Sequence, residues 1–452
     1  MNMHALSQLV CDWSYQDTWV QAMRDLLARG VSGKLAPFSL LSFPEMSAGE
    51  QRQCSELWLR DRIAASEEQR QARNFEFTPS GRMKLRIGYL SSDFHEHATA
   101  FLLVEMLELH DRARFEIFAY SYGPDDGKGM RQRLERTFDR FTDIEALTNE
   151  DAASLIHRDG IDILVDLKGY TRASRTMILT FRPAPIQVNY LGYPGTLGGD
   201  FADYIVTDPV LTPQESAEHY SEAFAYLPDS YQPHGCRGAV GEKPSRKDAG
   251  LPERGFVFCC FNQAYKITPV VFDIWCRLLA AVPGSVLWLL KNPSAEANLE
   301  REALRRGIAP ARLVFADEKP QIEHLGRLQL ADLMVDTWPY NAHTSASDAL
   351  WAGVPIVTCM GETFPSRVAG SLLSAIGLPE LITTELGDYH DLALELATQP
   401  ERLARVNARL MANRLTTPLF DTPRYTRNLE ALYQAMWQRY ADGLAPGIIR
   451  LD

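Results

Sequence analysis

The chain has 452 residues, which is too long for one compact hydrophobic core, so we expect two large domains and an appendage. Its net charge of -12 excludes a surface built to bind nucleic acid, although it is compatible with a small phosphate pocket. Hydrophobic residues make up 46% and charged residues 23%, which are ordinary values for a globular protein.

The cysteines and the first residues predict a cytoplasmic protein. The seven cysteines include no CxxC pair, and Cys259 and Cys260 lie in an apolar run, where thiols usually act as small hydrophobic groups. The N-terminus lacks the basic region and apolar stretch of a secretory signal. No segment approaches about 18 consecutive apolar residues, the length that a membrane-spanning helix needs.

Residues 1–80 are expected to form a helical segment. Segment 3–29 has the pattern of one helix, and Ser47 and Glu50 form a capping-box pattern that opens a second helix to about Arg73. No period near 34 residues is present, so we expect no array of tetratricopeptide repeats.

From about Lys84 onward, short apolar runs alternate with helix-patterned stretches, which is typical of parallel sheets covered by helices on both faces. The first series of expected strands is 85–90, 115–122, 162–167, 186–192, 204–208 and 223–228. The second series is 256–261, 285–290, 312–316, 333–337 and 355–360. The polar, Gly- and Pro-rich stretch 234–255 predicts a linker between them.

The predicted fold class is therefore α/β, with two doubly wound, Rossmann-like domains facing a central cleft. We place these domains at 81–235 and 236–425. Apolar residues at helical spacing in 426–443 predict a terminal helix, within 426–452, that packs back on the body.

Segment 336–358 has the pattern of a phosphate site. A strand is expected to end near Asp336 and a helix to run from about Thr344 to Trp351. Thr344 and Ser345 would leave unpaired N–H groups at the positive end of that helix, where a diphosphate binds well. Asp348 could accept a hydrogen bond from a ribose hydroxyl. The alternative is that Thr344 or Ser345 simply caps the helix.

A second candidate is Lys266, which follows the expected strand 256–261. At the carboxyl end of a strand it would face the same cleft and could neutralise charge on a departing diphosphate. The alternative is that Lys266 is a solvated surface lysine, as a lone lysine usually is.

His95 and His97 follow the first strand of the first domain. They lie two residues apart, but no third ligand is spaced to complete a metal site, so we expect no metal. A histidine facing the cleft could relay a proton from an acceptor hydroxyl. Polar capping of the following helix is the alternative.

Several glycines surround the end of the strand expected at 186–192. Glycine permits a ligand to approach the backbone closely, although it also serves ordinary turns. These glycines are Gly192, Gly195, Gly198 and Gly199.

Eight motifs in register resemble the catalytic region of the O-GlcNAc transferase/SPINDLY family, over roughly residues 9–440. They are SSDFHEH, DLKGYTRASR, RPAPIQVNYLGYPGTLG, DYIVTD, FNQAYKI, VPGSVLWLL, LADLMVDTWPYNAHTSASDALWAGVPIVT and GETFPSRVAGSLL. The resemblance implies a GT-B fold and an inverting, metal-independent transfer of a sugar from a nucleoside diphosphate to Ser or Thr of a protein. It implies no cofactor, a domain at 81–235 on the acceptor side and a domain at 236–425 that binds the nucleotide sugar.

The resemblance also assigns roles to single residues. Lys266 matches the lysine that stabilises the leaving diphosphate, and His97 matches a histidine near the acceptor, either a general base or a pocket residue. The remaining matched positions contact the donor. Gln263 lies beside that lysine, His324 stacks on the base, His343, Thr344 and Ser345 bind the diphosphate, and Asp348 binds the ribose. The donor sugar is lined by Thr171, Leu191, Gly192 and Pro194.

The chain departs from the family in three places. Gln321 stands where animal members have a lysine near the base, and Tyr340 stands where they have a cysteine beside the N-acetyl group. The superhelix of tetratricopeptide repeats is absent from the sequence. The resemblance implies UDP-GlcNAc or another UDP-hexose as the donor, whereas these departures keep UDP-glucose, GDP-fucose and an Asn acceptor as alternatives. A partner protein could deliver the acceptor, and a catalytically silent nucleotide-sugar-binding scaffold is a further alternative.

Overall fold

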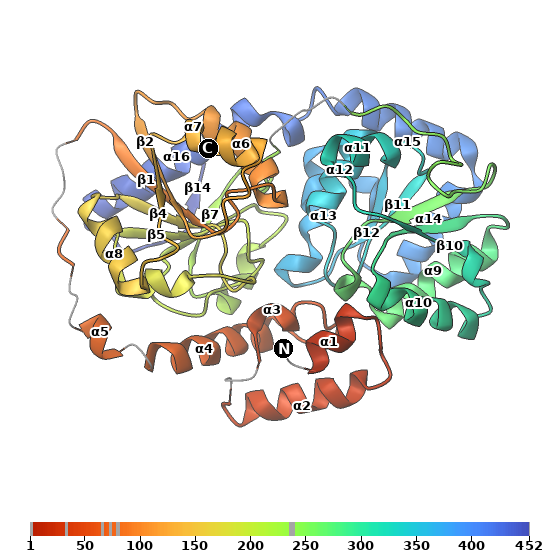
Figure 1. Cartoon of the computed structure of the whole chain (residues 1–452), viewed down its shortest axis with the longest axis horizontal. Coiled ribbons are helices and arrows are strands. Elements are labelled where there is room, and N and C mark those ends of the chain that lie inside the picture. The colour runs from red at the N-terminus through yellow and green to blue at the C-terminus, as the bar shows by residue number, and fades with distance from the viewer. Residues whose placement is uncertain are drawn as a thin grey trace. The chain divides into compact units, whose positions relative to one another are not determined.

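The structure is a computed structural model that describes residues 3–31, 35–64, 67–71, 75–77, 82–234 and 240–451. The chain forms two compact units, which Figure 1 shows with the chain coloured from red to blue. The N-terminal-sheet unit consists of Leu26–Phe38, Ala48–Cys236 and Pro418–Asp452. The C-terminal-sheet unit consists of Met1–Asp25, Ser39–Ser47 and Arg237–Thr417.

The N-terminal-sheet unit is built on an eight-stranded parallel sheet of order β14-β7-β6-β5-β4-β1-β2-β3. The strands are β1 (Leu85–Ser91), β2 (Phe115–Ser121), β3 (Arg140–Asp143), β4 (Ile163–Asp166), β5 (Ile186–Asn189), β6 (Tyr204–Thr207), β7 (Ala223–Tyr226) and β14 (Ile449–Arg450). The helices are α4 (Ala48–Ala64), α5 (Glu67–Gln71), α6 (Ala98–Glu108), α7 (Gly129–Thr137), α8 (Asn149–Arg158) and α16 (Thr422–Ala441), with 3-10 turns η1 (Thr176–Phe181), η2 (Gln214–His219) and η7 (Pro418–Phe420).

The C-terminal-sheet unit is built on a six-stranded parallel sheet of order β10-β9-β8-β11-β12-β13. Its strands are β8 (Val257–Cys260), β9 (Val286–Leu290), β10 (Leu313–Ala316), β11 (Leu333–Val335), β12 (Ile356–Cys359) and β13 (Ile382–Thr383). Its helices are α1 (Met3–Leu9), α9 (Pro269–Ala281), α10 (Pro293–Arg305), α11 (Gln321–Leu328), α12 (Thr344–Ala352), α13 (Val368–Ala375), α14 (Leu386–Thr398) and α15 (Pro400–Asn413), with 3-10 turns η3 (Ala264–Lys266), η4 (Pro310–Arg312), η5 (Phe364–Ser366) and η6 (Pro379–Leu381). The short helices α2 (Gln16–Ala28) and α3 (Pro37–Leu40) have residues in both units.

All strands expected from the sequence are present, and the structure adds β3, β13 and β14. Each of these three lies at an edge of its sheet. β13 and β14 have two residues each, and no residue of β3 is buried. An edge strand is covered on fewer sides, so its sequence need not be an apolar run, and the pattern that identified the central strands is missing.

The expectation of one helix over 3–29 is wrong. The chain forms α1 and α2, which are separated by a turn in which Cys11 has the left-handed φ of 51°. Within this turn, the backbone N–H and the hydroxyl of Ser14 both donate to Asp12 Oδ1. Helix α4 begins one residue after Ser47, as expected, but it ends at Ala64. Arg73, the expected end of that helix, and residues 235–239 of the expected linker lie outside the described residues.

The terminal helix α16 begins at Thr422, earlier than the expected 426, and packs on α6 of the N-terminal-sheet unit. A buried network connects α16 to β1 and to the turn after α6. Tyr89 Oη lies 3.2 Å from Tyr433 Oη and 2.8 Å from His110 Nε2, and His110 Nδ1 lies 2.9 Å from Glu430 Oε1. These groups satisfy one another away from water, which holds α16 in place. No helix in the described part of the chain is long and apolar enough to cross a bilayer.

Candidate active site

Lys266 is a buried lysine at the end of β8. The strand is fully buried, and the chain leaves it through the turn η3, whose last residue is Lys266. The Lys266 side chain is 8% exposed, and its Nζ donates a 2.8 Å hydrogen bond to the carbonyl of Asn341. The same nitrogen lies 3.9 Å from the centre of the Tyr340 ring. Lys266 is therefore not the solvated surface lysine that a lone lysine usually is.

Lys266 has no direct ion-pair partner among the described residues. Its ammonium group contacts a carbonyl dipole and an aromatic face, and the buried carboxyl of Asp336 interacts with it from beyond ion-pair distance. Burial lowers the pKa of Lys266 to about 7, and the nearby carboxyl of Asp336 opposes this effect. An anion that entered this position would restore the charged form.

The loop between β11 and α12 is held by a buried polar network. Asp336 accepts hydrogen bonds from the backbone of Thr337 and Ala342 at 2.8 and 2.7 Å, and from Thr358 Oγ1 at 2.6 Å. Burial raises the pKa of Asp336, although these hydrogen bonds oppose the shift. Thr337 Oγ1 donates to the carbonyl of Tyr340 at 2.6 Å. The network fixes the loop that presents the Asn341 carbonyl to Lys266.

Helix α12 begins with open donors. Its N-cap residue, His343, makes no capping hydrogen bond with its side chain, and the first two backbone N–H groups, of Thr344 and Ser345, donate to no acceptor in the described part of the chain. The Ser345 hydroxyl donates to Asn262 Oδ1, next to the β8 strand. The expected alternative, in which Thr344 or Ser345 caps the helix with its own side chain, is not what the structure has.

Two further groups on α12 are available to a ligand. His343 Nε2 is buried without a hydrogen-bond partner among the described residues, and burial together with the charge of Lys266 lowers the pKa of His343. Asp348 is half-buried, and its carboxylate makes no hydrogen bond or ion pair within the described ranges. Burial raises the pKa of Asp348 to about 7. Buried polar groups are almost always satisfied, so such groups indicate a ligand.

His324 belongs to a cluster at the start of α11. Its ring lies edge-on to Phe261 with centroids 5.1 Å apart, and Arg327 Nε donates to His324 Nδ1 at 3.2 Å. Arg327 also lies over the Phe261 ring, 4.9 Å from its centre. Burial lowers the pKa of His324 to about 4, so the ring is neutral and presents a flat surface. Gln321 is the first residue of the same helix.

Gln263 and Tyr340 differ in their surroundings. Gln263 is the N-cap of η3, and its side chain is exposed. Tyr340 is 4% exposed, its ring packs edge-on to Tyr265 with centroids 5.9 Å apart, and it lies 5.1 Å from the His343 ring. The large ring of Tyr340 therefore fills space beside Lys266 and His343.

The turn that carries Lys266 is also held from the N-terminus of the chain. The Cys11 thiol donates to the carbonyl of Ala264 in η3 at 3.4 Å. Asn292 Nδ2 and Asn298 Nδ2 donate to the carbonyls of Leu9 and Val10, at 3.1 and 2.7 Å. The segment after α1 is therefore part of the support of the Lys266 turn.

His97 lies in the N-terminal-sheet unit, in the connection that follows β1, and is the N-cap of α6. Its Nδ1 accepts a 3.2 Å hydrogen bond from the backbone N–H of Thr99, so the capping expected as one alternative is present. The His97 side chain is 41% exposed, and Nε2 has no partner in the described part of the chain. His95 lies beside it, with ring centroids 5.6 Å apart.

A buried ion pair lies under His97. Lys168 Nζ is 2.8 Å from both carboxylate oxygens of Asp93, and both residues are 6% exposed. Burial alone would raise the pKa of Asp93, but Lys168 and, in the acid range where Asp93 titrates, a protonated His97 lower it. Lys168 follows β4 and Asp93 follows β1, two strands that pair in the sheet with Leu90 opposite Asp166. Sequence reasoning missed this pair because its members are 75 residues apart.

The positions expected to line the donor sugar follow β4 and β5. Thr171 Oγ1 donates to the carbonyl of Lys168 at 2.9 Å, Pro194 is buried, and Leu191 has the left-handed φ of 70°. At Gly192 an added Cβ would lie 2.0 Å from the carbonyl oxygen of Leu167. The group that lies close to Gly192 is therefore the protein backbone at Leu167, after β4.

The predicted site residues fall into two groups. The C-terminal-sheet unit brings together Lys266, Tyr340, His343, Thr344, Ser345, Asp348, Gln263 and His324 around the ends of β8 and β11 and on α11 and α12. The N-terminal-sheet unit brings together His97, Thr171, Leu191, Gly192 and Pro194 after β1, β4 and β5. Sequence reasoning missed Asp336, Asn262 and Arg327, although Asp336 ends a predicted strand and Asn262 adjoins Gln263.

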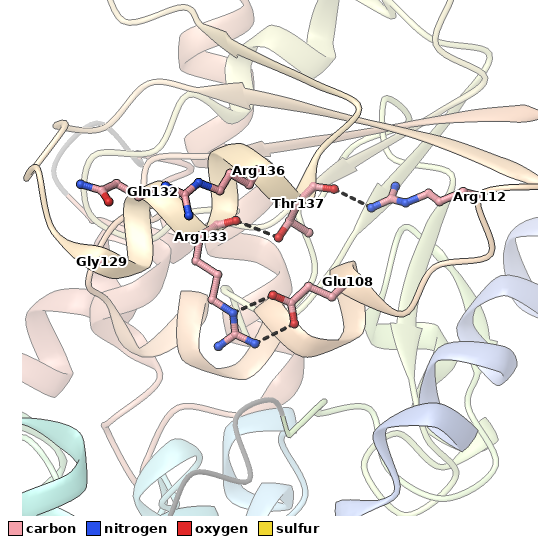
Figure 2. Close-up of a pocket in the computed structure, with 7 residues that line it drawn as sticks. All are labelled: Glu108, Arg112, Gly129, Gln132, Arg133, Arg136 and Thr137. Carbon is pink, nitrogen blue, oxygen red and sulfur yellow. Dashed lines mark hydrogen bonds and ion pairs between the residues drawn. The ribbon is translucent and has the colours of Figure 1, made fainter.

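A surface cavity of about 470 Å³ lies elsewhere, between α6 and α7 (Figure 2). Two of its arginines are committed to the protein. Arg133 Nε and an Nη of the same residue each lie 2.6 Å from the carboxylate of Glu108, and Arg112 donates to the carbonyl of Thr137 at 2.6 Å. Because these charges satisfy partners in the protein, we do not place the active site there.

The chain matches the model of glycosyl transferase family 41 over residues 10–234 and 242–429. This protein belongs to glycosyltransferase family 41. It is 40% identical to SEC of Arabidopsis thaliana over 374 residues, which is 81% of this chain and 38% of the relative. It is 30% identical to the UDP-N-acetylglucosamine–peptide N-acetylglucosaminyltransferase of Caenorhabditis elegans over 559 residues, which is 97% of this chain and 49% of the relative. The chain thus spans about half the length of these relatives, or less.

Among solved structures, a point mutant of the O-GlcNAc transferase of Thermobaculum terrenum is similar, with a TM-score of 0.83 and 29% identity over 98% of this chain and 83% of that chain. The Anabaena HepE protein in complex with UDP and glucose has a TM-score of 0.52 and 13% identity over 78% of this chain and all of that chain, a likeness of fold alone. The predicted GT-B fold and the resemblance to the O-GlcNAc transferase/SPINDLY family are confirmed.

Proposed function

We propose that this family 41 protein is an inverting, metal-independent glycosyltransferase that moves GlcNAc or a related hexose from a nucleoside-diphosphate donor to Ser or Thr of a protein. The observation that carries the proposal is the position of Lys266. It is a buried lysine without a direct ion-pair partner among the described residues, and it is bonded to the loop that leads into the open N-terminus of α12. A diphosphate is the anion that such a position fits.

The chemical role of this position follows from the charge that develops in the reaction. As the bond between the anomeric carbon and the leaving oxygen breaks, negative charge grows on the β-phosphate. Lys266 and the N–H groups of Thr344 and Ser345 are fixed before the reaction, so they stabilise this charge without reorganisation. This arrangement supports a transfer in which a side chain and a helix dipole supply the positive charge.

The remaining groups of the C-terminal-sheet unit support binding of the rest of the donor. Asp348 has a carboxylate without a partner in the described ranges, which suits the ribose hydroxyls. The neutral ring of His324 suits stacking on the nucleobase. Tyr340 occupies space beside Lys266, so we propose that its ring selects among donor sugars.

The acceptor is proposed to bind at the N-terminal-sheet unit, near His97. The curated relatives named as peptide N-acetylglucosaminyltransferases support a protein acceptor. We further propose that a separate partner protein can deliver this acceptor.

Two experiments test the function. Donor hydrolysis should be measured with UDP-GlcNAc, UDP-glucose and GDP-fucose. We expect turnover of a UDP-hexose, and we expect this turnover to persist in EDTA. Loss of turnover in EDTA that manganese restores would contradict the metal-independent mechanism. Mass spectrometry of proteins from cells with and without the intact gene should show a hexose or N-acetylhexosamine mass on Ser or Thr. Binding of UDP without turnover of any donor would favour the silent scaffold instead.

A further inference from the structure

His97 is the group on which the acceptor side of the proposed function depends, and its two ring nitrogens have different surroundings. Nδ1 accepts the backbone N–H of Thr99 at 3.2 Å, as the N-cap of α6. Nε2 has no partner in the described part of the chain, and the side chain is 41% exposed. A neutral imidazole carries one proton, and the nitrogen that accepts a hydrogen bond is the one without it.

The competing arrangement would place the proton on Nδ1. Asp93 Oδ2 lies 3.5 Å from His97 Nδ1. A carboxylate at this position could accept a hydrogen bond from a protonated Nδ1, which would leave Nε2 unprotonated and able to act as a base. In the structure this carboxylate is already occupied. Lys168 Nζ lies 2.8 Å from both of its oxygens, Ser92 Oγ donates to Oδ1 at 3.0 Å and Thr99 Oγ1 donates to Oδ2 at 3.3 Å.

We propose that His97 serves the reaction as a hydrogen-bond donor through Nε2–H, and that Thr99 and the Asp93–Lys168 pair hold it in this tautomer. His97 is then not the general base. The ligand of Nε2–H is an oxygen atom of the acceptor, its hydroxyl group. Asp93 and Lys168 are positioning residues, since they act through the ring of His97.

The charged groups around the ring support a neutral histidine. Burial lowers the pKa of His97, Asp93 opposes this effect, and Lys168 and His95 add to it. Asp126, the other carboxylate nearby, lies 3.9 Å from His95 rather than from His97. The positive end of the α6 dipole also disfavours an imidazolium at the N-cap.

The tautomer can be read directly and without any assay of activity. We expect ¹⁵N chemical shifts of the His97 side chain, assigned by comparison with His97→Gln, to show a protonated Nε2 and an unprotonated Nδ1 at pH 7.5. In Lys168→Gln, which keeps a hydrogen-bond donor but removes the charge, Asp93 is released and the proton should shift toward Nδ1. A proton on Nδ1 in the wild-type protein, or no change in Lys168→Gln, would overturn the proposal.

Kinetics of two isosteric variants give the second reading, which rests on the proposed function. The amide of His97→Gln places an N–H near the position of Nε2, whereas His97→Asn places an oxygen at the position of Nδ1 and keeps the cap. We expect His97→Gln to retain turnover within about tenfold, and His97→Asn to lose at least 100-fold at an unchanged melting temperature. Equal losses in both variants contradict the donor role. If the wild-type protein turns over no sugar nucleotide, the function has failed while the ¹⁵N result still decides the tautomer.

Discussion

The two units of this protein each carry a buried lysine after a parallel strand, and the two lysines are held in opposite ways. Lys168 is 6% exposed and its ammonium lies against both oxygens of Asp93. Lys266 is 8% exposed and contacts a carbonyl and an aromatic ring. Burial of a charge is costly unless a partner compensates it, so the charge of Lys266 is a cost that a substrate can relieve.

The carboxylates repeat the comparison. Asp93 is fully hydrogen-bonded within its own unit, whereas Asp348 has no partner among the described residues. The difference separates groups that maintain the fold from groups that await a ligand. For the two lysines, residue type and position after a strand are the same in both units, and only the contacts distinguish them.

The largest effect on stability is expected at Lys168. Lys168→Met leaves the buried carboxylate of Asp93 without its counter-ion, and we expect a loss of about 3–5 kcal/mol in the free energy of unfolding. Urea unfolding measures this loss. The double variant that adds Asp93→Asn should recover much of it, and a single variant as stable as the wild type would mean that the pair does not hold the fold.

The matched change at Lys266 should affect activity instead. Lys266→Met removes the cation at the leaving diphosphate, and we expect turnover to fall by about 10²–10³, or 3–4 kcal/mol. The pKa of Lys266 in the folded protein lies below that of an unfolded lysine, so at neutral pH this residue lowers stability and the effect disappears only at alkaline pH. The melting temperature of Lys266→Met should therefore be unchanged or higher. Turnover within about threefold of wild type would remove Lys266 from the mechanism.

A smaller effect is expected at Asp348. Asp348→Asn removes the charged acceptor proposed for the ribose and should raise the donor KM by roughly 10- to 100-fold, in line with about 1.5–3 kcal/mol for a hydrogen bond to a charged group. Because burial raises the pKa of Asp348 to about 7, the wild-type KM should rise as pH falls below 7. This dependence on pH should be absent in Asp348→Asn, and its persistence there would assign it to another group.

The smallest effect is expected at Cys11, whose thiol donates a hydrogen bond to the turn that carries Lys266. Cys11→Ala removes the hydrogen bond to Ala264 and should cost about 1 kcal/mol of stability with a modest change in kcat.

Deletion of residues 1–75 should lower the melting temperature and the rate of donor hydrolysis, since this segment is hydrogen-bonded to Ala264, Asn292 and Asn298. If the truncated chain keeps both and loses only protein glycosylation, the segment is a docking module.

Much of the fold follows from the sequence because the central strands are apolar runs and the helix at Thr344 has a clear start. What the sequence could not give depends on contacts across long separations. The burial of Lys266 and the pairing of Asp93 with Lys168 are decided by distant residues. The break of the first helix accompanies a local turn, in which Cys11 has a left-handed φ and Ser14 donates to Asp12. The capping role of His97 was one of two alternatives, and the structure contains it.

The central claim is that Lys266 awaits the anionic donor, and proton uptake on binding of UDP tests it most directly. Titration calorimetry at pH 8 in buffers of different ionisation enthalpy measures this uptake. Burial lowers the pKa of Lys266 in the free protein and the bound diphosphate should restore its charge, so the account predicts a net uptake of protons on binding. Lys266→Met should abolish the uptake and Lys168→Gln should preserve it. Binding of UDP without proton uptake by the wild-type protein, or with the same uptake by Lys266→Met, would contradict the account.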